Sequence, residues 1–326
     1  GSAGASGNRP TLDYTNPAVQ QYMVSTYLDP ALGGGFSEID IDDSTLYNVT
    51  DAAGHYSAGG TWVQQYSGSV SDHTWAAANA AALQQIVNSV KASYPNAHFG
   101  LNQGRDCIWN MTDWPLAFSS GVDMIFDEQG FTNYGSSPQY TTSDPRSDNA
   151  HNVTCQNSWL QKMQTYTSMQ KSQGKELMLD NEEPYTVSSS MTDSNSQARF
   201  DLQWALANYL LVKYKHTYFW WGGAAQYGYA PFLQREEEAQ IGSPADDFYA
   251  SQNVYMRDFS NGLALVNPSS RSPFTISLPA GRYQDLYGNA ISTYTMQPHS
   301  GLVLLHAMKG RQQDRFSKTM LMDSAA

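Results

Sequence analysis

The sequence is poor in basic residues. Its 18 Lys and Arg stand against 30 Asp and Glu, for a formal net charge of −12, and no basic stripe occurs. A chain this acidic repels phosphate groups, so binding to nucleic acid or to an anionic membrane is disfavoured. Long apolar runs are also missing: residues 218–221 form the longest near a strand, far short of the ~20 residues that a spanning helix needs.

Cysteine is nearly absent, and several familiar motifs are missing. Cys107 and Cys155 are the two thiols, and whether they pair stays open because the compartment decides it. With no Cys-x-x-Cys and only 7 scattered His, no structural zinc site is expected. The lack of Gly-x-Gly-x-x-Gly after the first strand and of Gly-x-Ser-x-Gly disfavours a nucleotide-binding sheet and an α/β-hydrolase esterase. We therefore expect no cofactor.

Uncharged polar residues and aromatics are abundant instead. Aromatics make up 13% of the chain and charged residues only 15%, so Ser, Thr, Asn, Gln and Gly must cover much of the surface. That composition is common in exported proteins, and we expect a secreted, extracellular or periplasmic protein. Residues 1–10 are predicted to be a linker foreign to the fold, and residues 309–326 a disordered tail.

Helical stretches alternate with short strands across residues 11–247. Five complete strands are predicted, at residues 36–43, 98–103, 122–128, 176–180 and 217–222. Such alternation indicates an α/β fold with a parallel sheet and crossover helices. Because the strands end in acids, amides or Trp, where barrel enzymes place their chemistry, we predict a (β/α)8-type, TIM-like barrel. Five strands leave it incomplete, so a second copy of the chain, in a homodimer, is expected to cover the open edge.

The pattern changes after residue 247. Short strand-like segments recur about every ten residues, separated by turn sequences such as Asn261-Gly262. Residues 248–308 are therefore predicted to form a C-terminal antiparallel β-sandwich.

Acidic residues at the strand ends are the strongest functional signal. They occur after three strands, as Asp40, Asp42 and Asp43, as Asp127 and Glu128, and as Asp180, Glu182 and Glu183. Cleavage of a glycosidic bond needs two carboxyl groups, one to donate a proton and one to attack the sugar or activate water. Strand alternation allows only one of Asp127 and Glu128 to face the barrel axis. Single acids can instead cap the next helix, and Asp40-x-Asp42-Asp43 could hold magnesium or calcium.

Aromatic and amide side chains form a second signal. Trp and Tyr can stack on the C–H faces of sugars, whose hydroxyls bind to Asn, Gln and Asp. Candidates for substrate binding are Asp40, Asp43, Asn102, Arg105, Trp109, Glu182, Trp220 and Trp221. Core packing is the alternative; it is expected for Trp75, Trp159 and Trp204, which lie in helices, and for one of Trp220 and Trp221. The histidines, His98 and His216 among them, have no obvious partner in the sequence.

Several segments together resemble a known family. They are Leu12-Asp13-Tyr14-Thr15-Asn16-Pro17, residues 35–43, residues 121–131 and the Arg-x-Phe-x-Asn-Gly pattern that begins at Arg257. They are similar to bacterial glycoside hydrolases related to the α-galactosidase and dextranase barrels, in which a barrel precedes a β-sandwich. The resemblance covers most of residues 11–305 and implies a carbohydrate substrate.

The resemblance also implies roles for single residues. If residues 36–43 are the fourth barrel strand and residues 122–128 the sixth, it implies Asp42 as nucleophile and Glu128 as general acid/base in a retaining mechanism. Asp180 would complete the catalytic centre by binding sugar hydroxyls. Two departures stand out: the first two strands are absent, and Ser37-Glu38 replaces the usual Asp-Gly. A carbohydrate-binding protein without activity and a metal-dependent hydrolase are the alternatives.

Overall fold

A computed structural model describes most of the chain. It describes residues 13–42, 54–67, 72–102, 114–128, 130–132, 159–183, 185–223, 226, 233–269 and 271–307. The chain divides into two compact units, one of residues 1–186 and 214–229 and the other of residues 187–213 and 230–326.

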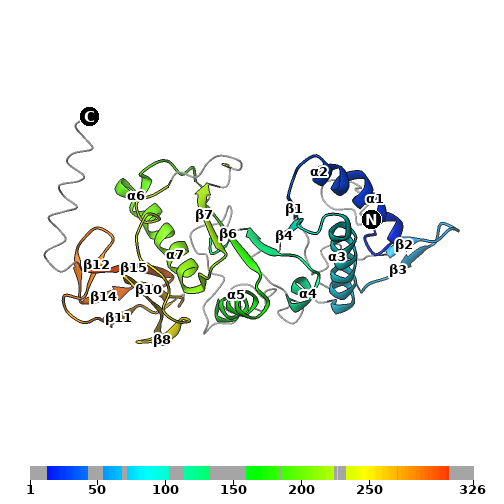
Figure 1. The fold of residues 1–326 in the computed structure, drawn as a ribbon. Helices are drawn as coiled ribbons and strands as arrows, with labels where there is room; N and C mark the ends of the chain where they lie inside the picture. Colours follow the sequence, from blue (N-terminus) through cyan, green and yellow to red (C-terminus); the bar gives the residue numbers. More distant parts are fainter. Residues whose placement is uncertain are drawn as a thin grey trace. The chain divides into compact units, whose positions relative to one another are not determined.

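A five-stranded parallel sheet is the centre of the first unit (Figure 1). Its order is β1 (Glu38–Ile41), β4 (His98–Asn102), β5 (Met124–Glu128), β6 (Glu176–Glu183) and β7 (Thr217–Gly223). These are the five predicted strands, and every neighbouring pair is parallel. Among the described residues β1 and β7 remain edges, so the predicted barrel is seen as an open sheet rather than a closed ring.

The helices of this unit begin and end at residues that the sequence marks. They are α1 (Pro17–Met23), the π-helical turn η1 (Val24–Leu28), α2 (Asp29–Gly33), α3 (His73–Ser93), α4 (Trp114–Ser119) and α5 (Trp159–Gln173), and a hairpin joins β2 (Gly54–Tyr56) to β3 (Trp62–Gln64). The Asp72 side chain caps α3 by accepting hydrogen bonds from the backbone N–H groups of Thr74 and Trp75. Gly174, with a φ of 64°, follows α5 as expected of a helix stop.

The two sides of the sheet differ sharply because side chains alternate along each strand. One side, which we call the helix side, contacts the helices: Lys91 of α3 lies over Phe99, and Gln170 of α5 accepts a hydrogen bond from Thr217. Several of its apolar side chains are fully buried, among them Phe99, Leu101, Ile125, Leu177 and Leu179.

The opposite side we call the open face. It comprises Glu38, Asp40, Asp42, His98, Gly100, Asn102, Met124, Phe126, Glu176, Met178, Asp180, Glu182, Tyr218, Trp220 and Gly222. Toward the amino ends of the strands these side chains are exposed or half-buried, including the apolar Met124, Phe126 and Met178. In a closed barrel this side would point into the interior.

The second unit contains two antiparallel sheets around one core, as the short strands predicted. The six-stranded sheet has the order β13 (Ala290–Ile291), β12 (Tyr283–Asp285), β15 (Ser300–His306), β10 (Gly262–Asn267), β9 (Val254–Phe259), β8 (Tyr249–Ser251). The second sheet pairs β11 (Phe274–Ser277) with β14 (Thr293–Met296). Both contribute to one apolar cluster, which includes Met256, Leu265, Ile276, Met296 and Leu302.

Two helices belong to this unit, α6 (Met191–Ser194) and α7 (Ser196–Val212). α7 packs closely on β15, where a Cβ at Gly301 would lie 2.2 Å from the carbonyl oxygen of Gln203. The compact unit thus includes residues 187–213, which precede the domain boundary predicted near residue 248.

Arg257 joins α7 to the sheet. Its side chain, 1% exposed, donates from Nη1 to the carbonyls of Leu210, Leu211 and Lys213 and from Nε to that of Asp246, over 2.7–3.1 Å. The last carbonyls of a helix have no partner within the helix. Arg257, from the pattern that carries the family resemblance, therefore acts as the C-terminal cap of α7.

Replacing Arg257 with Met should strongly destabilise the protein. The methionine cannot donate hydrogen bonds, so several buried carbonyls would lose their partners, at a cost of about 2–4 kcal/mol. Urea denaturation would measure it, with Arg271→Met, at an exposed position, as a control that changes stability by less than about 0.5 kcal/mol. Equal stability of both variants would contradict the capping role.

Candidate functional site

The carboxyl edge of the parallel sheet gathers the predicted acids. Asp42 follows β1, and its Oδ1 accepts a hydrogen bond of 2.8 Å from Nδ2 of Asn102 on β4. Asp180 lies on β6 and is the Cα partner of both residue 128 on β5 and Trp220 on β7. The structure therefore places Asp42, Asn102 and Asp180 on one face, at one edge of one sheet.

Asp127 and residue 128 fall on opposite sides of β5. Asp127, 3% exposed, faces α5, where Lys162 Nζ lies 2.9 Å from its Oδ2 and the Tyr166 hydroxyl donates to the same oxygen. It is thus a structural acid of the helix side. Residue 128 ends the strand in register with Asp180, and its side chain lies outside the described part of the chain.

The segment after β5 is attached to the end of β6. The Phe131 N–H donates to Asn181 Oδ1 over 2.8 Å, and the Thr132 hydroxyl donates to the Glu182 carbonyl over 2.7 Å. Gly130 has a φ of 46° and passes so near Asn181 that a Cβ would lie 2.5 Å from Asn181 Oδ1. Glycine is therefore required there, and the ends of β5 and β6 are held in fixed relation.

The two tryptophans of β7 have different roles, as strand alternation predicted. Trp221 is fully buried and donates from Nε1 to Glu183 Oε1 over 2.8 Å. Trp220 is half-buried on the open face beside Asp180. Trp221, expected among the substrate-binding residues, is instead part of the core, because alternation can offer only one of two successive side chains to the open face.

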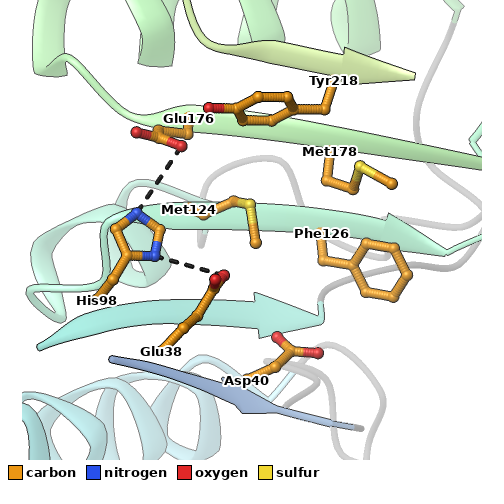
Figure 2. Close-up of a pocket in the computed structure, with 8 residues that line it drawn as sticks. All are labelled: Glu38, Asp40, His98, Met124, Phe126, Glu176, Met178 and Tyr218. Atoms are coloured by element: carbon orange, nitrogen blue, oxygen red, sulfur yellow. Dashed lines mark ion pairs between the residues drawn. The ribbon is translucent and has the colours of Figure 1, made fainter. Parts of the chain in front are cut away.

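A pocket occupies the open face below the acidic edge. Its volume is about 580 Å³, and its lining is Glu38, Asp40, His98, Met124, Phe126, Glu176, Met178 and Tyr218. Figure 2 shows the Met124 side chain between His98 and Phe126, with Met178 beside Phe126 on the next strand. The apolar residues of the lining were not predicted from the sequence. Met124 and Phe126 nevertheless occupy alternate positions before Glu128, which places them on the same side of the strand.

His98 has partners that the sequence did not suggest. Its Nδ1 lies 3.5 Å from Glu38 Oε1 and its Nε2 lies 3.8 Å from Glu176 Oε2, so the ring bridges carboxylates of β1 and β6 (Figure 2). His216 Nδ1 lies 3.8 Å from the other oxygen of Glu176. These contacts join strands distant in the sequence, so no local pattern could have found them.

Asp40 is the pocket acid nearest the predicted nucleophile. Its carboxyl lies over β4, where a Cβ at Gly100 would be 2.7 Å from Asp40 Oδ1. Although the residue as a whole is exposed, this position shields the carboxyl. Burial raises the pKa of Asp40 above its ordinary value of 3.8, and the negative charges of Asp42 and Glu38 raise it further.

Some predicted residues lie outside the described part of the chain. These are Asp43, Arg105 and Trp109, as well as Cys107 and Cys155. Within the described part, no three His, Cys, Asp or Glu side chains form a group that could hold a metal ion. In the same part, no helix is both long and apolar enough to span a membrane.

Comparison with known proteins adds little beyond the geometry. No protein family and no curated protein matches the sequence. Similar solved structures include α-amylases from Anoxybacillus (TM-score 0.42, 11% identity), Geobacillus thermoleovorans (0.39, 11%) and Lactobacillus plantarum (0.40, 11%). The matches cover 92%, 91% and 91% of this chain and 66%, 66% and 68% of those chains, respectively.

These likenesses are weak. The chain spans just under two thirds of the length of the Anoxybacillus enzyme, 66%. At TM-scores of 0.39–0.42 they establish neither a closed barrel nor an activity. The relation to α-galactosidases and dextranases stays a prediction.

Lys162→Met should destabilise the sheet by about 3–5 kcal/mol, because it leaves the buried Asp127 carboxylate without its cation. Urea denaturation followed by circular dichroism would measure the loss. Lys171→Met, at an exposed position of the same helix, is the matched control and should change stability by less than about 0.5 kcal/mol. A similar small effect for Lys162→Met would show that the buried pair contributes little.

Asp40→Asn should stabilise the protein near neutral pH and have little effect in acid. When folding raises the pKa of an acid, ionising that acid costs more free energy in the folded state than in the unfolded state. The resulting loss of stability is absent below pH 3.8, where the acid is protonated in both states, and it develops as the pH rises through the raised pKa. The amide keeps the shape and never ionises. Thermal denaturation across this range would test it, and a difference between variant and wild type that is independent of pH would contradict it.

Proposed function

We propose that the protein is a glycoside hydrolase that cleaves a polysaccharide or oligosaccharide with two carboxyl groups. One observation carries the proposal: Asp42, residue 128 and Asp180, far apart in the sequence, share the carboxyl edge of one parallel sheet beside a pocket of about 580 Å³. In parallel sheets, ligands and chemistry are found at this edge.

Spacing in the sheet suits the roles of nucleophile for Asp42 and general acid/base for Glu128. Their strands, β1 and β5, are separated by β4 alone, so at roughly 4.8 Å per strand the strand axes lie about 10 Å apart. Acidic side chains reaching toward each other across that gap can approach the 5–5.5 Å separation of a retaining pair. Asn102, which donates to Asp42, orients the nucleophile.

Asp180 and Trp220 complete the proposed site. Asp180 is in register with residue 128 on the neighbouring strand. We assign Asp180 the binding of sugar hydroxyls and Trp220 a contact with the sugar ring. The carbohydrate substrate and the export of the protein are parts of this proposal.

Hydrolysis assays with the full chain would test it. The wild type should cleave at least one member of a panel of polysaccharides and aryl glycosides. Asp42→Asn and Glu128→Gln should each lower kcat by roughly 10²–10⁴-fold, whereas Asp193→Asn, exposed on α6, should not. A wild type that cleaves nothing, or an Asp42→Asn variant of full activity, would refute the proposal.

A second candidate function is carbohydrate binding without catalysis. It is favoured by the open sheet, since the described strands do not enclose the acidic edge as a barrel would. Titration calorimetry distinguishes the two, because a binding protein would take up a sugar without turnover and would be unaffected by Glu128→Gln.

A further inference from the structure

The indole of Trp220 has a defined position on the open face. A Cβ at Gly222, two residues further along β7, would lie 2.4 Å from both Cζ2 and Cη2 of Trp220. The six-membered ring therefore lies over Gly222, directed toward the carboxyl end of the strand. The absence of a side chain at Gly222 is what permits this position.

The strand beneath the indole is held firmly. The carbonyl of Trp220 accepts a hydrogen bond of 3.0 Å from Asn181 Nδ2, and the indole of the next residue, Trp221, donates to Glu183 over 2.8 Å. β6 and β7 stay in register as far as Glu183 and Gly223. A flat aromatic surface on a rigid strand is pre-organised for binding, because little side-chain freedom remains to be lost.

Buried carboxylates are the indole's neighbours across the sheet: Asp180 is 6% exposed, and Glu182, predicted to bind substrate, is only 1% exposed and belongs to the core. Trp220 is the Cα partner of Asp180, and Gly222 is that of Glu182. An aromatic face beside hydrogen-bond acceptors matches a pyranose ring, which has an apolar C–H face and a rim of hydroxyls.

The charge of the open face limits which sugar can bind. Among its described residues are Glu38, Asp40, Asp42, Glu176, Asp180 and Glu182 but no Lys or Arg. In the described part of the chain, Lys91 and Lys162 lie on the helix side, where they pair with Asp123 and Asp127. A surface lined by charges of one sign repels ligands of the same sign.

We infer that Trp220, held over Gly222, is a stacking subsite for an uncharged pyranose ring directly beside Asp180, and that uronic acids and other anionic sugars are excluded from it. The inference rests on the proposed function, because it deepens the same site. Gly222 is a positioning residue in it, since it acts only through the indole.

Calorimetry with the inactive Asp42→Asn protein would test the subsite, since asparagine keeps an oxygen for Asn102 to contact. The probes are maltotriose and isomaltotriose as neutral sugars and trigalacturonate as the anionic one. At least one neutral sugar should bind and trigalacturonate should not. Adding Trp220→Ala should weaken neutral binding about tenfold, Trp220→Phe should recover part of it, and Tyr294→Ala, a partly exposed aromatic of β14, should change nothing.

Gly222→Ala provides an independent variant. Its methyl group would displace the indole, so neutral binding should fall about as far as with Trp220→Ala, and Trp220→Ala should add little to it. Because the methyl group could also weaken folding, each variant is first compared with its parent by thermal denaturation.

The outcomes separate this inference from the proposed function. Tight neutral binding by Trp220→Ala, equal binding of trigalacturonate, or no binding of any probe would overturn the subsite, even if wild type hydrolyses glycosides. Trp220-dependent binding of neutral sugars without any hydrolysis by wild type would support the subsite and refute the hydrolase.

Discussion

Alternation of side chains along parallel strands is the constraint on which the first unit depends. Each strand must present one side to the helices, and there water is excluded, so the side chains are apolar or belong to satisfied ion pairs. The other side carries acids, amides and Trp220; it is exposed or half-buried toward the amino ends of the strands, whereas Asn102, Asp180 and Glu182 at the carboxyl edge are buried. Adjacent residues of one strand show this division. Asp127 pairs with Lys162 and Trp221 donates to Glu183 on the helix side, whereas their neighbours, residue 128 and Trp220, belong to the open face.

The buried polar groups fix the geometry that any chemistry at the edge would need. Asn181 accepts from the segment after β5 and donates to the Trp220 carbonyl. One amide thus holds the ends of three successive strands, β5, β6 and β7, at a constant spacing. In the second unit Arg257 does comparable work by binding the carbonyls at the end of α7. A buried polar group without hydrogen-bond partners costs free energy. Each of these groups therefore favours the one arrangement of neighbouring elements in which its hydrogen bonds are made.

Much of the fold followed from local patterns. The five strands, the stop of α5 at Gly174 and the antiparallel strands after residue 248 were all predicted, because periodicity and glycine chemistry act over a few residues. The carboxyl edge was predicted as well, since parallel strands deliver their ends to one side. Closure into a ring was not decided by these patterns, and the described strands form an open sheet. That a second copy of the chain covers the open edge of the sheet stays a prediction.

By itself, the sequence determined which elements form and which residue types end the strands. Only the tertiary structure decided that Asp127 and Trp221 belong to the core, that His98 bridges Glu38 and Glu176, and that Trp220 lies over Gly222. The physical reason is range: strand alternation and helix capping depend on neighbours in the chain, whereas burial, ion pairing and the place of an indole depend on which distant strands and helices come together.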